Sequence, residues 1–385
     1  MTQRFRDALA APGLQAIAEV KRRSPSAGDL RLDADPAALA PAFADAGAAA
    51  CSILVDERFG GSFDDLRAAR AATALPLLAK GFFTEESHLR ACREAGADAA
   101  LLLLRDLDDG RAAALMAAAS ELGLETLVEA HDAEELGRAV RLGAPVIGLN
   151  ARDLSTFAID RSAQLALVAG APRDRVIVAE SAVDSRAKGA AAELAGADAI
   201  LVGSALMRAP DPAAKLSELL RRPLVKVCGL TREEDVAAAA EAGADLAGFI
   251  LAKESPRTAP GVLGVPETML SVAVHVGEVT DSDADLVQLY AREDGHRSRD
   301  AVLLRDGEQV ARVVDLPWET DDPTHLARAA EVDGRLMLAG GLDASNVRAA
   351  IASVRPWAVD ASSRLETAPG IKDHEKVRAF VEAAR

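Results

Sequence analysis

The sequence has few aromatic residues. Phe, Trp and Tyr together make up 3% of the 385 residues, with two tryptophans and one tyrosine. A core built on large aromatic clusters is therefore excluded. Half of the residues are hydrophobic and alanine dominates the helix-like stretches, so we expect close-packed interfaces of small aliphatic side chains.

Cysteine is also scarce. Cys51, Cys92 and Cys228 are an odd number without the spacing of a metal site. They are typical of reduced thiols in a cytoplasmic protein and not of a disulfide framework. The N-terminal stretch MTQRFRDALAAPG lacks a long apolar segment, and no apolar run reaches the length of a membrane span. We therefore expect a cytoplasmic protein with no membrane association.

Positive charge is in deficit. The formal net charge of −16 argues against a general binder of nucleic acid or of anionic membranes, because both need a basic surface. An anionic ligand must then be bound by a local basic pocket. No GxGxxG follows the first predicted strand, which disfavours a dinucleotide-binding domain.

What the sequence does contain is a repeated phrase. It reads DAGAAACSILV (45–55), EAGADAALLLL (94–104), LAGADAILVGS (194–204) and EAGADLAGFIL (241–251). Each copy has a glycine at a helix end, followed by an apolar run that is too short for a helix and suits a strand buried on both faces. The repeat predicts a succession of helix-to-strand units.

The first half of the chain contains eight such strands. They are predicted at 16–21, 50–55, 75–80, 98–104, 125–129, 145–150, 175–180 and 198–203. Helix-length segments separate most of them, which favours a (β/α)₈ TIM barrel over an open sheet.

A new cycle starts at RRPLVKVCGL (221–230). Its strands are predicted at 224–228, 245–251, 271–276, 285–289, 310–315, 335–339 and 357–361, with 300–304 as the weakest candidate. RDGEQ (305–309) reads as a hairpin turn with no room for a crossover helix. The predicted fold class is α/β, with two tandem (β/α)₈ TIM barrels over 1–221 and 222–385, the second shortened.

Polar residues end five of the first eight strands. These are Glu19 and Lys21, Lys80, Glu129, Asn150 and Arg152, and Glu180 and Ser181, while the last strand leads into Gly203 and Ser204. A single charged residue at a strand end is ordinarily a solvated rim residue. Five strands that end this way indicate one site at the C-terminal end of a barrel. Its acids and bases suit proton transfer, and Lys21, Lys80 and Arg152 suit an anionic substrate. The Gly203–Ser204 turn is either a phosphate-binding helix start or an ordinary N-cap.

The motifs of the first half resemble those of indole-3-glycerol-phosphate synthase over about residues 14–220. The matching stretches are AIAEVKRRSPSAG, LLAKGFF, TLVEAH, VIGLNARDLSTFAID, VIVAESAV and ILVGSALM. The resemblance implies ring closure of 1-(2-carboxyphenylamino)-1-deoxyribulose 5-phosphate, with loss of carbon dioxide and water, and no cofactor or metal.

The resemblance also implies roles for individual residues. Lys80 would be the general acid for ring closure, Glu129 an acid–base group for dehydration, and Glu19 a group that orients or relays protons. Lys21 would lie near the substrate's phosphate and carboxylate. The remaining expectations are Ser24 and Ser26 in a mobile loop, Asn150 and Arg152 at the anthranilate part, Glu180 and Ser181 in the cavity wall, and Gly203 and Ser204 at the phosphate.

The second half resembles phosphoribosylanthranilate isomerase through VKVCGLTREEDV, GFILAKESPR, LMLAGGLDASNV and VDASSRLETAPGIKDHEK. Taken alone, Cys228 would be a buried structural thiol, but the CGLT context implies the general base. Asp315 would be the acid and Arg257 a substrate contact. The phosphate end would be lined by Gly340, Gly341, Asp360, Ser362 and Ser363.

Three hypotheses follow for the whole chain. The first is a bifunctional, monomeric enzyme that acts on phosphosugar-anthranilate substrates. The second is a synthase whose second barrel is inactive. The third is a phosphosugar-binding protein without turnover. The acids at Glu19 and Glu129 speak against the third hypothesis, because binding of an anion needs only the basic residues.

Overall fold

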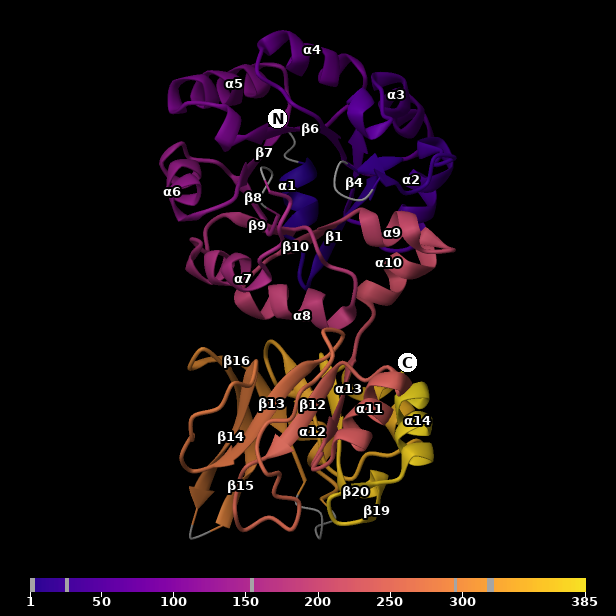
Figure 1. Cartoon of the computed structure of the whole chain (residues 1–385), viewed down its shortest axis with the longest axis vertical. Coiled ribbons are helices and arrows are strands. Elements are labelled where there is room, and N and C mark those ends of the chain that lie inside the picture. The colour runs from indigo at the N-terminus through magenta and orange to yellow at the C-terminus, as the bar shows by residue number, and fades with distance from the viewer. Residues whose placement is uncertain (1–3, 25–27, 153–155, 294–295, 317–321) are drawn as a thin grey trace. The chain divides into compact units, whose positions relative to one another are not determined.

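The computed structural model describes most of the chain. The described residues are 4–24, 28–152, 156–293, 296–316 and 322–385. By internal contacts the chain divides into two compact units, Met1–Ser185 with Gly189–Leu220, and Arg186–Lys188 with Arg221–Arg385. Each unit contains a closed eight-stranded barrel, so the prediction of two barrels is confirmed (Figure 1).

The first barrel is regular. Its strands are β1 (Gln15–Val20), β4 (Ala50–Leu54), β5 (Leu77–Lys80), β6 (Ala99–Leu103), β7 (Glu125–Ala130), β8 (Val146–Asn150), β9 (Val176–Glu180) and β10 (Ala199–Val202). Every neighbouring pair is parallel, and β1 closes the ring by pairing with both β4 and β10. All eight predicted strands are therefore present.

Helices cover the outside of this barrel (Figure 1). They are α2 (Pro36–Asp45), α3 (Phe63–Ala72), α4 (Glu86–Glu94), α5 (Asp109–Glu121), α6 (Ala133–Arg141), α7 (Arg161–Gly170), α8 (Arg186–Ala195), α9 (Ser204–Arg208) and α10 (Pro212–Leu220). The sequence sets several of their starts, since the side chains of Asp35, Ser62 and Asp132 accept backbone N–H groups of the first turns of α2, α3 and α6.

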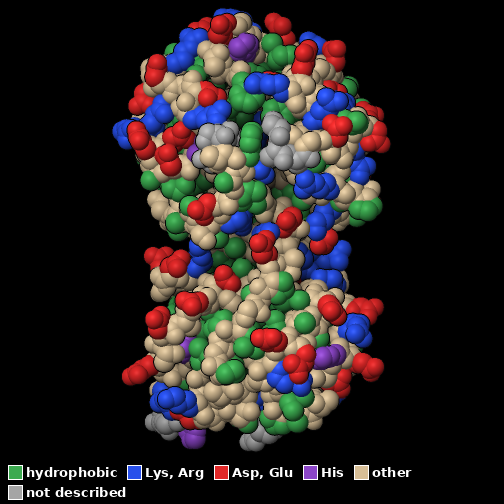
Figure 2. All heavy atoms as spheres, in the orientation of Figure 1, with side chains coloured by type: hydrophobic (Ala, Val, Ile, Leu, Met, Phe, Trp, Pro, Cys, Tyr) green, Lys and Arg blue, Asp and Glu red, His purple; other side chains and the backbone are tan. Residues whose placement is uncertain are grey.

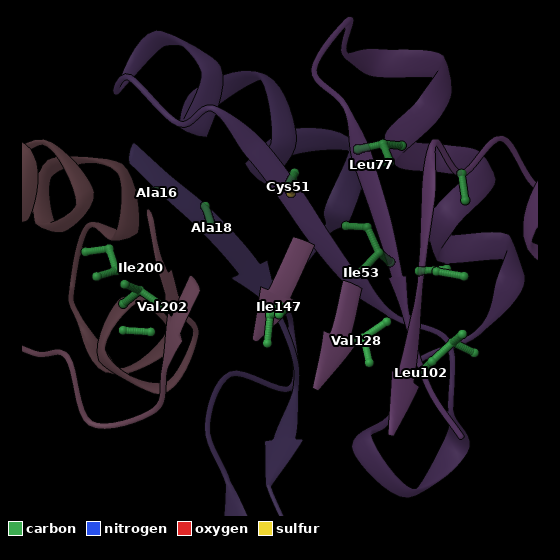
Figure 3. Packing of buried hydrophobic residues seen from close by; sticks show 14 of the residues in the cluster. Ala16, Ala18, Cys51, Ile53, Leu77, Leu102, Val128, Ile147, Ile200 and Val202 are labelled. Atoms are coloured by element: carbon green, nitrogen blue, oxygen red, sulfur yellow. The ribbon is translucent and has the colours of Figure 1, made fainter. Parts of the chain in front are cut away.

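The alternation along β1 decides which side chains enter the barrel. Ala16 and Ala18 point outward into the aliphatic layer beneath the helices, where Figure 3 shows them among the other buried residues of that layer. Ile17 points inward, and the short helix α1 (Arg4–Leu9) adds Phe5 to the same inner cluster. With a period of two, Glu19 follows Ile17 on the inner side.

The second barrel is less regular. Its strands are β11 (Leu224–Cys228), β12 (Leu246–Ile250), β13 (Leu270–Val276), β14 (Leu286–Glu293), β15 (His296–Arg305), β16 (Glu308–Val314), β17 (Leu336–Leu338) and β18 (Ala358–Ala361). Its described helices are α11 (Glu233–Ala242), α12 (His325–Ala330), α13 (Val347–Val354) and α14 (His374–Ala383). In Figure 1, α11 and α14 lie on one side of this barrel, and β13–β16 form the other side.

One strand of the second barrel is reversed. β15 pairs antiparallel with both β14 and β16, whereas the other pairs are parallel. Asp306 and Gly307, both with positive φ, form the tight turn from β15 to β16, as the RDGEQ stretch predicts. The weakest strand candidate, 300–304, is in fact a ten-residue strand. The barrel still closes, because closure requires a continuous ring of hydrogen-bonded strands and a reversed strand can be part of that ring.

The surface, the cysteines and the helices each bear on the class of function. On the face seen in Figure 2, acidic and basic side chains are interspersed. All three cysteines are buried and unpaired. Among the described residues, no helix is both long and apolar enough to cross a bilayer. Over the same residues, no group of His, Cys, Asp and Glu side chains is placed to hold a metal ion.

Candidate functional site

The first barrel holds a cavity of about 400 Å³ at the C-terminal ends of its strands. It contains most of the residues that the sequence singled out for this barrel. Those in its wall are Glu19, Lys21, Ser24, Lys80, Glu129, Asn150, Arg152 and Ser181. The barrel therefore brings together side chains that lie up to 162 positions apart in the chain, from Glu19 to Ser181.

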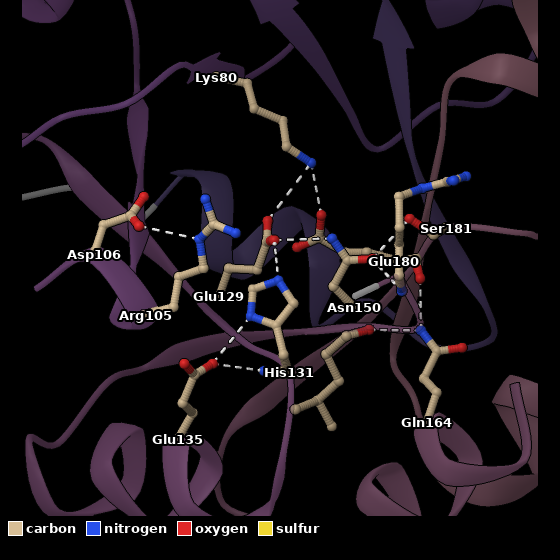
Figure 4. A network of polar contacts seen from close by, with 12 residues as sticks. Lys80, Arg105, Asp106, Glu129, His131, Glu135, Asn150, Gln164, Glu180 and Ser181 are labelled. Carbon is tan, nitrogen blue, oxygen red and sulfur yellow. Dashed lines mark hydrogen bonds and ion pairs between the residues drawn. The ribbon is translucent and has the colours of Figure 1, made fainter. Parts of the chain in front are cut away.

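The ammonium group of Lys80 lies between three carboxylates that come from three different strands. Its Nζ is 2.6 Å from Oε2 of Glu180, 3.5 Å from Oε2 of Glu19 and 3.8 Å from Oε2 of Glu129. Figure 4 shows Lys80 pointing toward Glu129 and Glu180. The three carboxylates are buried, while the side chain of Lys80 remains 15% exposed to the cavity. A single cation is thus shared by three acids.

This crowding shifts the pKa values in different directions. Burial disfavours the charged ammonium of Lys80, but the surrounding carboxylates outweigh burial and raise its pKa. Burial likewise opposes ionisation of Glu129, yet Lys80, His131 and Asn150 lower its pKa to about 2. Burial and the charge of Glu129 raise the pKa of Glu180 to about 8. Near neutral pH the site therefore holds a protonated Lys80 beside an ionised Glu129.

Asn150 connects the carboxylate of Glu129 to the opposite wall of the cavity. Its Nδ2 donates to Oε1 of Glu129 at 2.8 Å. Its Oδ1 accepts from the backbone N–H of Arg152 at 2.9 Å and from the hydroxyl of Ser181 at 2.7 Å (Figure 4). Ser181 has a φ of +69°, a strained value for a residue other than glycine. The three hydrogen bonds fix the orientation of the Asn150 amide.

Two glycines leave room for the acids. A Cβ atom at Gly148 would lie 2.1 Å from Oε1 of Glu180. At Gly203 it would lie 2.3 Å from Oε1 of Glu19 and 3.0 Å from Nζ of Lys21. That space is occupied by the ion pair between Lys21 and Glu19, whose Nζ and Oε1 are 2.7 Å apart. A side chain at either glycine would therefore displace a carboxylate of the site.

Some predicted residues lie elsewhere. Glu180 is 1% exposed and lies behind the cavity wall, where it contacts Lys80. Gly203 precedes α9, and Ser204 is its first residue, but neither belongs to the cavity wall. Ser26 falls outside the described residues.

The sequence reasoning missed part of the cavity wall. Arg58, Phe59, Phe82, Arg105 and Phe157 also line it. The guanidinium of Arg58 lies 3.9 Å from the ring centroid of Phe82. Phe82 belongs to the LLAKGFF motif, where an aromatic residue, rare in this chain, stands two positions after the strand-end lysine.

His131 was also passed over, although it ends the TLVEAH motif. Its Nε2 lies 3.2 Å from Oε1 of Glu129 and its Nδ1 lies 3.0 Å from Oε2 of Glu135 (Figure 4). Burial alone would lower the pKa of this imidazole, but the two carboxylates raise it to about 10. The side chain is therefore positively charged at neutral pH.

The second barrel has its own cavity of about 380 Å³. All of the residues that the sequence proposed for this half line it: Cys228, Arg257, Asp315, Gly340, Gly341, Asp360, Ser362 and Ser363. The reversed strand β15 contributes Arg297, which the sequence reasoning did not consider. The neighbouring strand β14 contributes Gln288 and Tyr290.

Asp315 accepts hydrogen bonds on both carboxylate oxygens. Oδ2 accepts from the hydroxyl of Tyr290 at 2.7 Å and lies 3.1 Å from Nη1 of Arg297. Oδ1 accepts from the backbone N–H of Leu316 at 2.7 Å. Burial nevertheless raises the pKa of Asp315, against the opposing effects of Arg297 and Tyr290. This carboxyl group is thus biased toward its protonated form.

The thiol of Cys228 ends strand β11 beside a buried ion pair. Lys226, two residues earlier on the same side of the strand, has its Nζ 2.8 Å from Oδ2 of Asp360 and 2.9 Å from Oε1 of Gln288. Burial raises the pKa of the Cys228 thiol, although the charge of Lys226 opposes this shift. A Cβ at Gly248 would lie 2.7 Å from the sulfur, so a glycine is needed there.

Arg257 is held by an acid that it shares with a buried lysine. Its Nε donates to Oε2 of Glu366 at 2.9 Å, and Nζ of Lys372 lies 2.7 Å from Oε1 of the same carboxylate. Lys372 also donates to the carbonyl oxygen of Ser362 at 3.2 Å. Positive charge is therefore fixed next to the serines predicted for the phosphate end.

Comparison with known proteins finds a different family model in each half of the chain. Residues 1–219 match the family model described as indole-3-glycerol phosphate synthase. Residues 267–383 match that of N-(5'-phosphoribosyl)anthranilate isomerase. Among curated relatives, the indole-3-glycerol phosphate synthase of Leifsonia xyli subsp. xyli is 50% identical over 214 residues, which is 55% of this chain and 82% of that protein. The Mycobacterium avium enzyme of the same name is 44% identical over 214 residues, covering 55% of this chain and 79% of that protein.

Among solved structures, the chain is similar to TrpF from Jonesia denitrificans. The identity is 30%, the match covers 43% of this chain and 97% of that one, and the TM-score is 0.35. Because the synthase model spans more than half of the chain, the family is established. The chain belongs to the indole-3-glycerol phosphate synthase family and is a two-domain protein of tryptophan biosynthesis, in which an isomerase domain follows the synthase domain.

Proposed function

We propose that the first barrel converts 1-(2-carboxyphenylamino)-1-deoxyribulose 5-phosphate to indole-3-glycerol phosphate, carbon dioxide and water. The observation that carries the proposal is the position of Lys80, whose ammonium lies within 3.8 Å of carboxylates from β1, β7 and β9 at the edge of the cavity. Since these carboxylates raise its pKa, Lys80 is protonated at neutral pH and can act as the general acid for ring closure.

The other groups of the cavity suit the remaining steps. Glu129 is ionised and contacts the cavity, as a base for the dehydration must be. Lys21 and Arg152 supply positive charge for the phosphate and the carboxylate of the substrate. Glu19 lies between Lys21 and Lys80, at 2.7 and 3.5 Å, where it can orient both ammonium groups.

The test is a synthase assay of the purified chain and of Lys80→Ala. We expect the substitution to lower kcat by about 10³-fold or more, because the proton donor is lost. Lys215→Ala is the matched control, since Lys215 forms an ion pair with Glu218 on helix α10, away from the cavity. Wild-type turnover in Lys80→Ala would contradict the proposal.

For the second barrel we propose the isomerisation of phosphoribosylanthranilate to the substrate of the first barrel. The supporting observation is that Cys228 and Asp315, a candidate base and a candidate acid, face one cavity. Asp315 would protonate the ribose ring oxygen, while Cys228 would remove the proton from the sugar C2.

Isomerisation should disappear in Cys228→Ala while synthase activity remains. Cys92→Ala is the control, because Cys92 is a buried thiol of helix α4 in the first barrel. If the wild-type chain does not isomerise the substrate, the second barrel is an inactive companion of the synthase. If it performs neither reaction, a phosphosugar-binding role replaces both proposals.

A further inference from the structure

The synthase cavity contains a buried oxygen whose orientation needs a cause. Oε2 of Glu129 is buried and, among the described residues, has no hydrogen-bond partner. Oε1 of the same carboxylate lies 2.8 Å from Nδ2 of Asn150 and 3.2 Å from Nε2 of His131. Nζ of Lys80 lies 3.8 Å from Oε2, too far for a hydrogen bond, so the close contacts on Oε1 contribute most to holding the carboxylate in this orientation.

Glu135 fixes His131 on the side of the ring that faces away from Glu129. Oε2 of Glu135 lies 3.0 Å from its Nδ1 and also accepts the backbone N–H of His131 at 2.8 Å. Glu135 is fixed at the start of helix α6, where its own N–H donates to the side chain of Asp132 at 2.8 Å. A continuous chain of contacts thus runs from the N-terminus of α6 to the carboxylate in the cavity, as Figure 4 shows for Glu135, His131 and Glu129.

The surroundings of this histidine favour its charged form. Each ring nitrogen of His131 faces a carboxylate oxygen. A neutral imidazole has one N–H, so it would direct a lone pair at one of the two carboxylates. Nε2 has no hydrogen-bond partner among the described residues, so its contact with Glu129 is an ion pair, which the imidazolium ion favours on both sides of the ring. A fixed positive charge therefore lies on the side of Glu129 that faces away from Lys80.

We propose that His131 is a positioning residue of the synthase site. Its imidazolium, fixed by Glu135, holds Oε1 of Glu129 and favours the ionised carboxylate, so that Oε2 stays directed toward Lys80 at the edge of the cavity. This inference rests on the proposed function, because it assigns a task to the base of that reaction. Asn150 donates to the same oxygen and also favours the ionised carboxylate, but it adds no positive charge beside it.

Kinetics of His131→Phe and His131→Gln test the proposal. We expect His131→Phe to lower kcat of the synthase about 100-fold with little change in KM, because a reacting group is displaced. His131→Gln keeps a donor and should recover part of that loss. Glu134→Gln is the matched control, since Glu134 is an exposed neighbour on the first turn of α6.

The pH profile separates positioning from a merely structural role. The titratable groups that act on Glu129 are His131, Lys80 from β5 and Glu180 from β9, while Glu19 from β1 acts on Lys80. Loss of the imidazolium removes a positive charge beside this base, so the pKa of Glu129 rises. The acid limb of the kcat profile should therefore move to higher pH in both variants. The two shifts should be similar in size, whereas the two variants should differ more in their loss of kcat.

A measurement without turnover completes the test. In ¹⁵N-histidine NMR of the full chain, the resonance that disappears in His131→Gln should retain imidazolium shifts well above pH 7. A neutral ring at pH 7, or wild-type kcat and an unmoved acid limb in His131→Phe, would overturn the inference. If His131→Phe is unaffected while Lys80→Ala is inactive, the role of His131 is refuted but the proposed synthase function stands. If the wild-type chain has no synthase activity, the proposed function fails with it.

Discussion

Each barrel has a lysine on the inner face of a strand, but the two lysines lie at different depths along their strands. In the first barrel Lys80 ends β5, reaches the cavity and is shared by three carboxylates. In the second, Lys226 lies in the middle of β11, is fully buried and is paired with Asp360 and Gln288. The difference shows that depth along the strand separates a lysine that can meet a substrate from one that stabilises the barrel beneath its site.

The barrels also differ in how many of their strands are followed by helices. In the first, a helix follows each strand, whereas in the second β14, β15 and β16 are joined without helices and β15 is reversed. The cavity nevertheless remains, because Cys228, Asp315, Gly340 and Asp360 still lie at the ends of parallel strands. A barrel can therefore lose crossover helices on one side while the strands that carry the site stay in register.

The largest effect should come from Lys226→Met. The substitution leaves the carboxylate of Asp360 buried without its cation, so we expect the second barrel to lose about 3–5 kcal/mol of unfolding free energy. Urea unfolding, followed together with both activities, measures it. Lys215→Met, on the surface of α10, should change stability by less than about 0.5 kcal/mol. Equal stability of both variants would mean that Lys226 does not stabilise its barrel, and the contrast with Lys80 would no longer hold.

Gly148→Ala should act on the first barrel through geometry alone. The new methyl group would meet Oε1 of Glu180 and displace this carboxylate from Lys80. We expect kcat of the synthase to fall about 100-fold, while isomerase activity is unchanged. Gly170→Ala, at the end of α7 with no heavy atom within 4 Å of the added carbon, is the control. An active Gly148→Ala would mean that Glu180 is dispensable near Lys80.

Arg297→Ala tests whether the reversed strand contributes to function. The guanidinium opposes the effect of burial on Asp315, so its removal should raise the pKa of Asp315 further. An acid acts while it is protonated, and the basic limb of the isomerase profile should therefore move to higher pH, with about a tenfold change in kcat. Arg299→Ala, on the same strand but paired with Asp322, should leave the profile in place. An identical shift in both variants would assign the effect to β15 as a whole.

The smallest effect concerns stability. Because the pKa of His131 is raised above its unfolded value, the imidazolium contributes stability that is fully present below about pH 6.5 and is lost as pH rises through about 10. The difference in unfolding free energy between wild type and His131→Gln should therefore shrink over this window. Denaturation curves at pH 6, 8 and 10 measure it. A constant difference would indicate that His131 stabilises the barrel by packing alone.

Much of this protein can be predicted from local patterns. The strand positions follow from short apolar runs between glycine-terminated helices, and the inward direction of Glu19 follows from its spacing to Ile17. The RDGEQ turn likewise follows from two residues that accept positive φ. His131 escaped because its partner Glu135 lies on the next helix, and a lone histidine after a strand carries no signal of its own.

The sequence by itself determined two barrels, the hairpin that replaces a helix, and the set of acids and bases at the strand ends, because each depends on periodicity or on residues close together in the chain. Only the tertiary structure decided that Lys80 is shared by three carboxylates, that Glu180 lies behind the wall, and that Arg297 reaches Asp315. These arrangements depend on the depth of each side chain in a closed barrel. Closure of the ring, which brings β1 against β10, fixes that depth.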